Sequence, residues 1–324
     1  MTKEEIVKLL QQDMRDEHQA IIQYLGHAYA MPEGELRCAI EGVARDEMRH
    51  LDWLADAIAE LGGDPSMERT PPDLTAGTPA EQMRKNVGLE DGAIAQYRAH
   101  VAAIPDPKIQ RLLARILNDE LAHHDEFEGL THLAETEYAA EPAAEPAMPK
   151  QPPPRVAAIL NQGIRHEYTV ILQYLYHSFV AEGKEMAEEL QNVAINEMQH
   201  MGWLSEELAE KGGVPEMEHT DLVLTRDPEE ALKADIAVER KVTNDYTSQV
   251  NELADEDTRS LVARIRDHEI YHEAVFADLL EEHEEEEEAA ERAEAAAEPQ
   301  PERLEEPKPA PPTIPSIGSL IDKH

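Results

Sequence analysis

Residues 46–54 read Asp-Glu-Met-Arg-His-Leu-Asp-Trp-Leu, and residues 196–204 read Asn-Glu-Met-Gln-His-Met-Gly-Trp-Leu. Both stretches carry the pattern Glu-x-x-His-x-x-Trp-Leu, and they lie 150 residues apart. The Glu-x-x-His motif occurs at two more matching places, Glu120/His123 and Glu269/His272. The sequence therefore indicates one unit that has been duplicated.

Each half also contains two glutamates without a following histidine, at matching spacing. In the first half the gaps are 30, 43 and 30 residues, between Glu17, Glu47, Glu90 and Glu120. In the second half they are 30, 42 and 30 residues, between Glu167, Glu197, Glu239 and Glu269. Repeats of this size are whole domains, and a chain of 324 residues can hold two. We predict domains at 1–138 and 155–290, a Pro/Ala/Glu linker at 139–154, a flexible Pro/Glu-rich tail at 291–312 and a terminal peptide at 313–324.

Composition limits the classes of protein and of partner. Hydrophobic residues make up 41% of the chain, which is enough to bury a core in each half. The formal net charge of -40 attracts cations and disfavours nucleic acid and anionic membranes as partners. The single cysteine, Cys38, excludes a disulfide framework, a thiolate zinc site and a rubredoxin-like iron centre. No signal-like or membrane-spanning apolar stretch is visible, so we expect a cytoplasmic protein.

Helical signals run through both halves. Thr2/Glu5 and Thr78/Glu81 read as capping boxes, proline follows Asp106 and Asp227, and Gly-Gly pairs at 62–63 and 212–213 end helices. We predict helices at roughly 3–31, 35–61, 79–103, 107–137, 155–182, 184–211, 228–253 and 256–290. In each half the second and third helices are joined by a connection long enough to cross a bundle. The expected fold is all-α, with two tandem four-helix bundles that each have one long crossover.

The matched glutamates occupy positions where the helical pattern calls for core residues. Glu17, for example, lies on the apolar stripe of Met14 and Ile21. Four buried carboxylates repel one another and need protons or cations, and two divalent ions carry four compensating charges. Carboxylate and imidazole ligands without thiolate suit iron or manganese. One further Glu-x-x-His motif, Glu216/His219, lies in a proline-containing connection and is interpreted as a chance match.

These motifs resemble those of the ferritin-like di-iron superfamily, and most closely those of bacterioferritins. The resemblance covers residues 3–137 and 155–283 and is carried by Gln-Tyr-x-x-His at 23–27, Asp-Glu-Met-Arg-His at 46–50 and Asn-Asp-Glu-x-x-His at 118–123. It implies two di-iron centres per chain, with Glu47 and Glu120 bridging the irons, Glu17 and Glu90 as terminal ligands, and His50 and His123 each on one iron. In the second half it implies the same roles for Glu197 and Glu269, Glu167 and Glu239, and His200 and His272.

The implied activity is ferroxidation, in which two Fe(II) ions give electrons to oxygen or peroxide and leave as Fe(III) for storage. Tyr24 and Tyr174 match a redox-active tyrosine of bacterioferritins, although a core tyrosine would look the same. Met48 and Met198 match the position of a haem-ligating methionine, so that one chain could hold haem b between its halves. Methionine is also common in helices for packing reasons, which weakens the haem prediction.

The halves differ beside the expected ligands. Asp46 and Asp119 precede the bridging glutamates of the first half and could orient the histidines. Asn196 and His268 stand at those positions in the second half. We therefore hypothesise that the two centres handle iron differently.

The C-terminus resembles the cargo-loading peptides of encapsulin nanocompartments, which often contain an aliphatic residue followed by Gly-Ser-Leu. The resemblance lies in Ile317, Gly318, Ser319, Leu320 and Ile321, at the end of a proline-rich stretch. An extended peptide can seat aliphatic side chains in pockets of a shell protein. The final short helix that ferritins use in cage building is missing, which argues against a ferritin cage and leaves another homo-oligomer open. The resemblance implies a location inside an encapsulin shell; an unstructured tail or another partner is the alternative.

Two other functions remain open at this stage. One is a peroxide-scavenging di-iron or di-manganese enzyme, similar to rubrerythrins or manganese catalases. The other is a non-catalytic iron-binding cargo.

Overall fold

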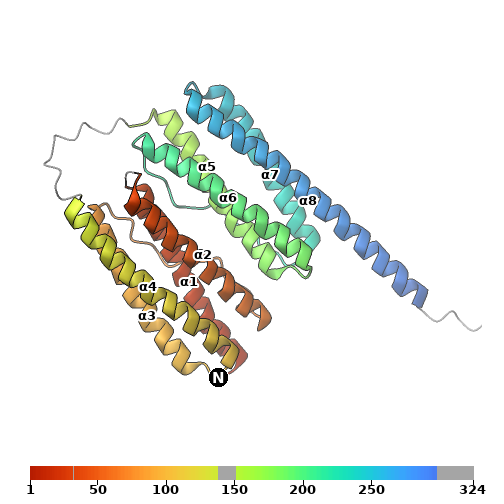
Figure 1. Ribbon diagram of the computed structural model, residues 1–324. Helices are drawn as coiled ribbons and strands as arrows, with labels where there is room; N and C mark the ends of the chain where they lie inside the picture. The colour runs from red at the N-terminus through yellow and green to blue at the C-terminus, as the bar shows by residue number, and fades with distance from the viewer. Residues whose placement is uncertain (32, 138–150, 298–324) are drawn as a thin grey trace, which may run out of the picture. The chain divides into compact units, whose positions relative to one another are not determined.

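The computed structural model describes residues 1–31, 33–137 and 151–297, and within them it contains eight α-helices and no strand. The predicted all-α fold is confirmed. Figure 1 shows the helices in two groups of four, with bounds α1 Lys3–Tyr29, α2 Glu35–Glu60, α3 Pro79–Ala103, α4 Pro107–Glu137, α5 Pro154–Val180, α6 Lys184–Glu210, α7 Pro228–Glu252 and α8 Glu256–Ala297.

Local sequence explains where the helices begin and end. Thr2 and Thr78 each cap a helix with a reciprocal bond to the glutamate three residues later, so both predicted capping boxes are present. The side chain of Asp227 accepts from the backbone of Glu230 at the start of α7. Gly62 and Gly212 follow α2 and α6 with φ of 84° and 79°, a region in which glycine avoids the strain of a side chain.

One predicted boundary is wrong. Seven predicted helices agree with the structure to within two residues at each end, but α8 continues to Ala297 instead of ending near 290. The extension is rich in alanine and glutamate, which are strong helix formers. An ion pair of 2.6 Å between Arg292 and Glu288, one turn apart, supports it. Residues 291–297 are therefore helix and not part of an extended tail.

The long crossovers, from α2 to α3 and from α6 to α7, run along α1 and α5. In the first half, Gln11 donates to the carbonyl of Asp64, and the backbone of Asp73 donates to Gln23 at 2.9 Å. The second crossover repeats the last contact, since the backbone of Val223 donates to Gln173 at 2.9 Å. Each crossover thus runs toward the C-terminal end of the first helix, and the third helix returns antiparallel to it. This arrangement brings one face of all four helices of a half to a common interior.

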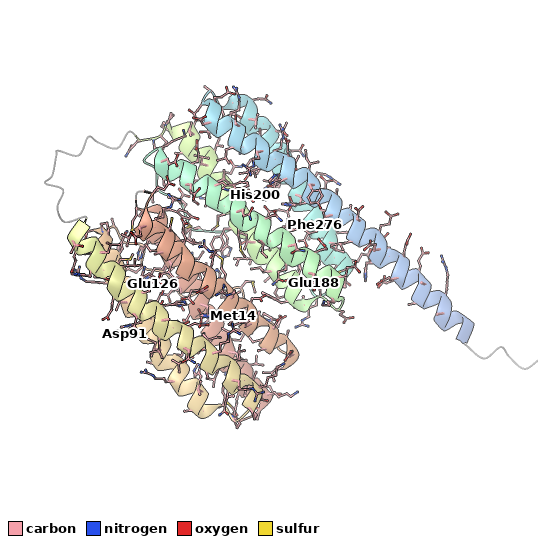
Figure 2. All side chains as sticks on the ribbon, in the orientation of Figure 1. Met14, Asp91, Glu126, Glu188, His200 and Phe276 are labelled. Atoms are coloured by element: carbon pink, nitrogen blue, oxygen red, sulfur yellow. The ribbon has the colours of Figure 1, made fainter. Side chains whose placement is uncertain are left out.

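Residues Met1–His283 form one compact unit, and the part of α8 from Glu284 onward lies outside it. The core is continuous through the compact unit, and Figure 2 labels three buried side chains within it, Met14, His200 and Phe276. The two halves touch in this unit through His18 and Tyr168, whose Nε2 and hydroxyl oxygen lie 2.6 Å apart. Among the described residues, no helix is both long and apolar enough to span a membrane.

Candidate metal centres

The first bundle brings its four matched glutamates and two histidines together in its interior. They form two overlapping groups, and within each group ligand atoms lie within 4.8 Å of one another. One group contains Glu17 and His50 and the other Glu90 and His123, while Glu47 and Glu120 belong to both. Two metal positions that share two carboxylates would have this arrangement.

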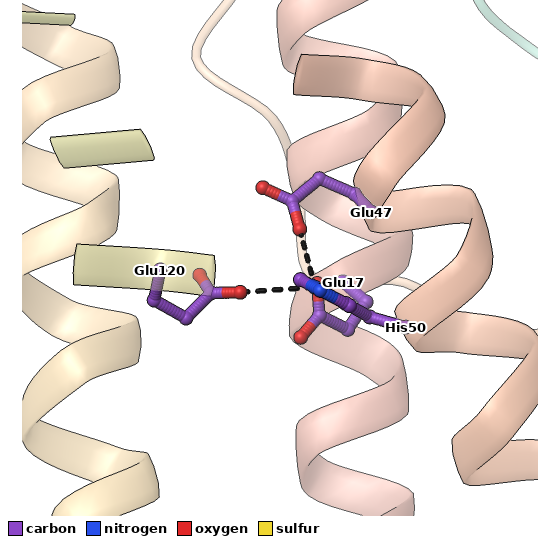
Figure 3. A group of neighbouring side chains, drawn as sticks. All are labelled: Glu17, Glu47, His50 and Glu120. Atoms are coloured by element: carbon purple, nitrogen blue, oxygen red, sulfur yellow. Dashed lines mark ion pairs between the residues drawn. The ribbon is translucent and has the colours of Figure 1, made fainter. Parts of the chain in front are cut away.

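The helices supply these ligands by simple geometry. Each of the four helices contributes one glutamate, and the three-residue spacing puts the histidine on the same helical face. All six side chains are buried, with exposed fractions between 0 and 3%. Figure 3 shows Glu17, Glu47 and Glu120 around the ring of His50, each from a different helix.

The distances show that the donor atoms converge on points inside each group. Nδ1 of His50 lies 2.7 Å from Glu47 Oε2, 3.0 Å from Glu120 Oε1 and 3.7 Å from Glu17 Oε2 (Figure 3). Nδ1 of His123 lies 3.1 Å from Glu47 Oε1. Both Nδ1 atoms and both oxygens of Glu47 are buried without a hydrogen bond of good geometry. Buried polar groups left in this way fit a metal ion as their missing partner.

The second bundle repeats the arrangement. Glu197 and Glu269 are shared between a group that contains Glu167 and His200 and a group that contains Glu239 and His272. Nδ1 of His272 lies 2.7 Å from Glu197 Oε1, and both oxygens of Glu269 lack a hydrogen bond of good geometry. The twelve predicted ligand residues thus lie in two matching buried clusters.

Burial and mutual repulsion perturb these groups strongly. Burial, followed by the charges of Glu120 and Glu197, raises the pKa values of Glu90 and Glu239 well above the usual range. Burial lowers the pKa of His123, but contact with Glu47 outweighs it and the resulting pKa is about 9. Protons on Glu90, Glu239 and His123 therefore offset part of the charge in the metal-free clusters, and a bound divalent ion would displace them.

Tyrosines hold the two non-shared glutamates of each half. The hydroxyl of Tyr24 donates to Glu90 and that of Tyr97 donates to Glu17. In the second half, Tyr174 donates to Glu239 and Tyr246 to Glu167. The sequence prediction singled out Tyr24 and Tyr174 but missed Tyr97 and Tyr246. The sequence does contain a pattern that identifies them, because each of the four tyrosines comes seven residues after a non-shared glutamate.

The outer side of the histidines differs between the halves. In the first half, Nε2 of His50 lies 3.4 Å from Asp119 and Nε2 of His123 lies 3.4 Å from Asp46. In the second half, Nε2 of His200 lies 2.9 Å from Nδ1 of His268. The side chain of Asn196 donates to the carbonyl of its own helix at Asn192. In the first half each histidine therefore has an aspartate carboxylate next to its Nε2 atom. In the second half the neighbour of His200 is an imidazole, which is neutral or cationic.

Met48 and Met198 line one cavity of about 730 Å³ inside the unit Met1–His283. Its walls come from α1, α2, α5 and α6 and include apolar side chains such as Leu25 and Leu175. Arg45 and Arg49 also line it, as do the acidic residues Glu41, Asp52 and Glu206. The apolar walls and one methionine from each half suit a haem, and charges of both signs line the same cavity.

Comparison with known proteins agrees with this geometry. The model of the ferritin family, described as a ferritin-like domain, matches residues 7–136 and again residues 157–286. This chain belongs to the ferritin family. Each of the two matched ranges covers most of one four-helix bundle. Bacterioferritin of Desulfovibrio desulfuricans is 28% identical over 134 residues, which is 40% of this chain and 75% of that protein. No solved structure matches this chain.

The predicted partner-binding residues 317–321 lie outside the described residues, as do the linker residues 138–150 and the proline-rich stretch from 299 to 312.

Proposed function

We propose that this protein is a ferroxidase that oxidises Fe(II) at two paired-metal centres, one in each half, for iron storage. The observation that carries the proposal is the pair of shared glutamates in each bundle, flanked by one further glutamate and one histidine on either side. Membership of the ferritin family and similarity to a bacterioferritin support iron as the metal.

Each residue type has a distinct part in this proposal. Glu47 and Glu120 would bridge two Fe(II) ions in the first half, because each lies in both ligand groups. Glu17 and Glu90 would each complete one position, with their carboxylates oriented by Tyr97 and Tyr24. Glutamates Glu197, Glu269, Glu167 and Glu239 have the same parts in the second half. Four carboxylates balance the charge of two Fe(II) ions, which makes paired loading favourable in a buried site.

The reaction transfers one electron from each of two Fe(II) ions to one oxidant. Dioxygen takes up two electrons and two protons to give peroxide, or peroxide takes up two electrons and two protons to give water. Metals about 3.5 to 4 Å apart allow a single oxidant to reach both. Tyr24 and Tyr174 touch the ligands directly and are candidates for supplying an electron, and Tyr97 and Tyr246 have equivalent contacts.

Anaerobic loading followed by mixing with oxidant tests this function. Purified protein is titrated with Fe(II) and then mixed in a stopped-flow instrument with oxygen or, separately, with peroxide. We expect a fast rise in ferric absorbance that saturates near four Fe(II) per chain. Rapid turnover of peroxide without iron accumulation would instead favour a rubrerythrin-like or manganese-catalase-like enzyme. Tight binding without oxidation would favour a non-catalytic iron-binding cargo.

The two centres are expected to work at different rates. Outer partners that orient ligating histidines are worth about 10- to 100-fold in metal affinity or activity. The first centre has Asp119 behind His50, whereas the second has His268 behind His200. We therefore expect Glu197→Ala, which leaves the first centre, to oxidise Fe(II) about 10-fold faster than Glu47→Ala, which leaves the second. Adding His268→Asp to Glu47→Ala is expected to bring its oxidation rate closer to that of Glu197→Ala. Equal oxidation rates in Glu197→Ala and Glu47→Ala would refute the expected difference between the two centres.

A second ligand, haem b, is favoured by the cavity that Met48 and Met198 share. Their thioethers would ligate the iron, and Arg45 would pair with an acidic side group. Haem would supply a one-electron carrier between the protein surface and the stored iron. Protein produced with added haem is expected to show a Soret band that Met48→Leu/Met198→Leu lacks. A wild-type protein without this band would reject haem binding.

We further propose that the protein is cargo of an encapsulin shell. The support is the terminal sequence Ile317-Gly318-Ser319-Leu320-Ile321, which is similar to cargo-loading peptides, after a proline-rich stretch that suits a solvated tether. Fe(III) released by the two centres would then accumulate inside the shell.

A further inference from the structure

A cavity of about 220 Å³ lies between α1 and α3 of the first bundle. Its lining includes the exposed Gly92, the half-buried Asp16 and Gln96, and the buried Glu17 and Glu120. The last two belong to the metal-ligand group around His50. The cavity therefore joins the surface of the bundle to one of the metal positions.

The lining of this cavity suits a hydrated cation. Asp13, Asp16, Glu17 and Glu120 contribute carboxylates, and no lysine or arginine lines it. Gln96 holds the two aspartates together, because its Nε2 donates to Asp13 at 2.9 Å and to Asp16 at 3.0 Å. Glu120, 2% exposed, has a buried Oε1 without a hydrogen bond of good geometry at the inner end. An acidic passage of this kind concentrates cations at its inner end.

The second bundle carries different residues on the matching face. Val170 and Val242 stand where the first half has Ala20 and Ala93, and all four positions belong to the same two helices of their bundle. Both valines are buried, at 0 and 3% exposure. The larger side chains take up space that the alanines leave open in the first bundle.

The acidic residues are also replaced. Gly163 matches Asp13, and a side chain there would meet Leu204 at 2.8 Å and the hydroxyl of Tyr246 at 3.0 Å. His166 matches Asp16, and the exposed Lys241 matches Gly92 at the mouth. Asp245 matches Gln96, so the second bundle has one aspartate where the first has two, and it carries a cation where the first bundle has a bare backbone.

We propose that the cavity between α1 and α3 is the entrance through which divalent cations reach the first metal centre, and that the second centre fills by another route. The proposal rests on the proposed metal centres and adds how one of them is supplied. It assigns the half-buried Asp16 to the capture of the incoming ion, whereas the buried Asp13 is paired with His100.

Gly92→Lys tests the entrance by giving the first half the residue that the second half has. A side chain at Gly92 meets no atom within 4 Å, so the variant is expected to fold. Gly88→Lys is the matched control, because Gly88 is an exposed glycine one turn earlier with the same free space and does not line the cavity. Both changes are made in full-length protein with Glu197→Ala, so that binding reports on the first centre.

The measured quantity is the rate of Co(II) binding, followed by its visible absorbance in a stopped-flow instrument. We expect Gly92→Lys to slow binding about 10-fold or more relative to Gly88→Lys, with the same final absorbance, since electrostatic steering changes association rates by 10- to 1,000-fold. Asp16→Asn is expected to slow binding and to weaken its dependence on salt. Equal Co(II) binding rates for Gly92→Lys and Gly88→Lys, or no Co(II) binding by the first centre, would overturn the proposal that this cavity is the entrance. Because Co(II) is not oxidised here, a slowed Gly92→Lys supports the entrance even if wild-type protein fails to oxidise Fe(II).

Discussion

Glu47→Ala/Glu197→Ala is expected to abolish the fast oxidation of Fe(II). Each of these glutamates belongs to both ligand groups of its bundle, so its loss removes a ligand from both metal positions at once. Changes to outer partners of ligands already cost about 10- to 100-fold, and we expect the loss of a shared ligand to exceed 100-fold. Stopped-flow ferric absorbance after anaerobic loading measures the effect, and the tightly bound Fe(II) per chain should fall from about four.

The double variant should remain folded, which keeps the experiment interpretable. Glu47 and Glu197 are fully buried among other carboxylates, with 0% exposure. Removing Glu47 relieves its repulsion with Glu17, whereas removing Glu197 takes a carboxylate partner from His200 and His272. Thermal unfolding of the metal-free proteins measures the balance of these two opposite effects, and we expect a folded variant because the apolar core is unchanged. Added Fe(II) should raise the melting temperature of the wild type but not that of the variant, because a ligand stabilises only the state that binds it.

The chain supplies its own control in Glu216. This residue is also followed by a histidine three positions later, but it is exposed in a crossover and forms an ion pair with Arg165. The ring of His219 contacts the backbone carbonyl of Thr220 at 2.7 Å. Glu216→Ala should oxidise Fe(II) at the wild-type rate. Fast oxidation in the Glu47→Ala/Glu197→Ala variant would refute the proposed centres.

The fold was predictable because local signals and the repeat agree. Thr2, Thr78 and Asp227 cap helices where the sequence indicates caps, and glycines 62 and 212 follow helices as expected. The end of α8 was not predictable from polarity, because a solvated Ala/Glu-rich stretch can be extended or helical. Residue spacing also indicated the buried glutamates, since only one face of each helix can reach the bundle interior.

The parts of the site that the sequence analysis missed depend on contacts between helices. Tyr97 looked like an ordinary core residue on α3, and its role depends on the antiparallel packing that puts its hydroxyl against Glu17 on α1. The cavity beside Gly92 is likewise invisible in one helix alone, because α1 and α3 both line it. Comparing the halves position by position would have drawn attention to Gly92 and Lys241, but not to the space between the helices.

Deletion of residues 313–324 is expected to reduce loading into an encapsulin shell to background. The metal-ligand groups lie within residues 17–272, far from the deletion in sequence, so purified protein should oxidise Fe(II) at the wild-type rate. Co-expression with a shell protein, followed by isolation of assembled shells and quantification of cargo, measures loading. Loss of loading with unchanged oxidation would separate the targeting role of the peptide from the catalytic role of the bundles.

Point variants test whether the shell protein recognises the aliphatic side chains of the terminal peptide. Peptides that bind in an extended form place alternate side chains in pockets, and a buried unpaired carboxylate in such a pocket is costly. Ile317→Asp/Leu320→Asp is therefore expected to reduce loading as strongly as the deletion. Ser316→Asp adds a charge next to the same segment without removing an aliphatic group, and it should leave most of the loading intact. Undiminished loading of the deletion variant would exclude the terminal peptide as the shell-binding element, whereas equal losses in both point variants would point to charge rather than aliphatic contact as the determinant.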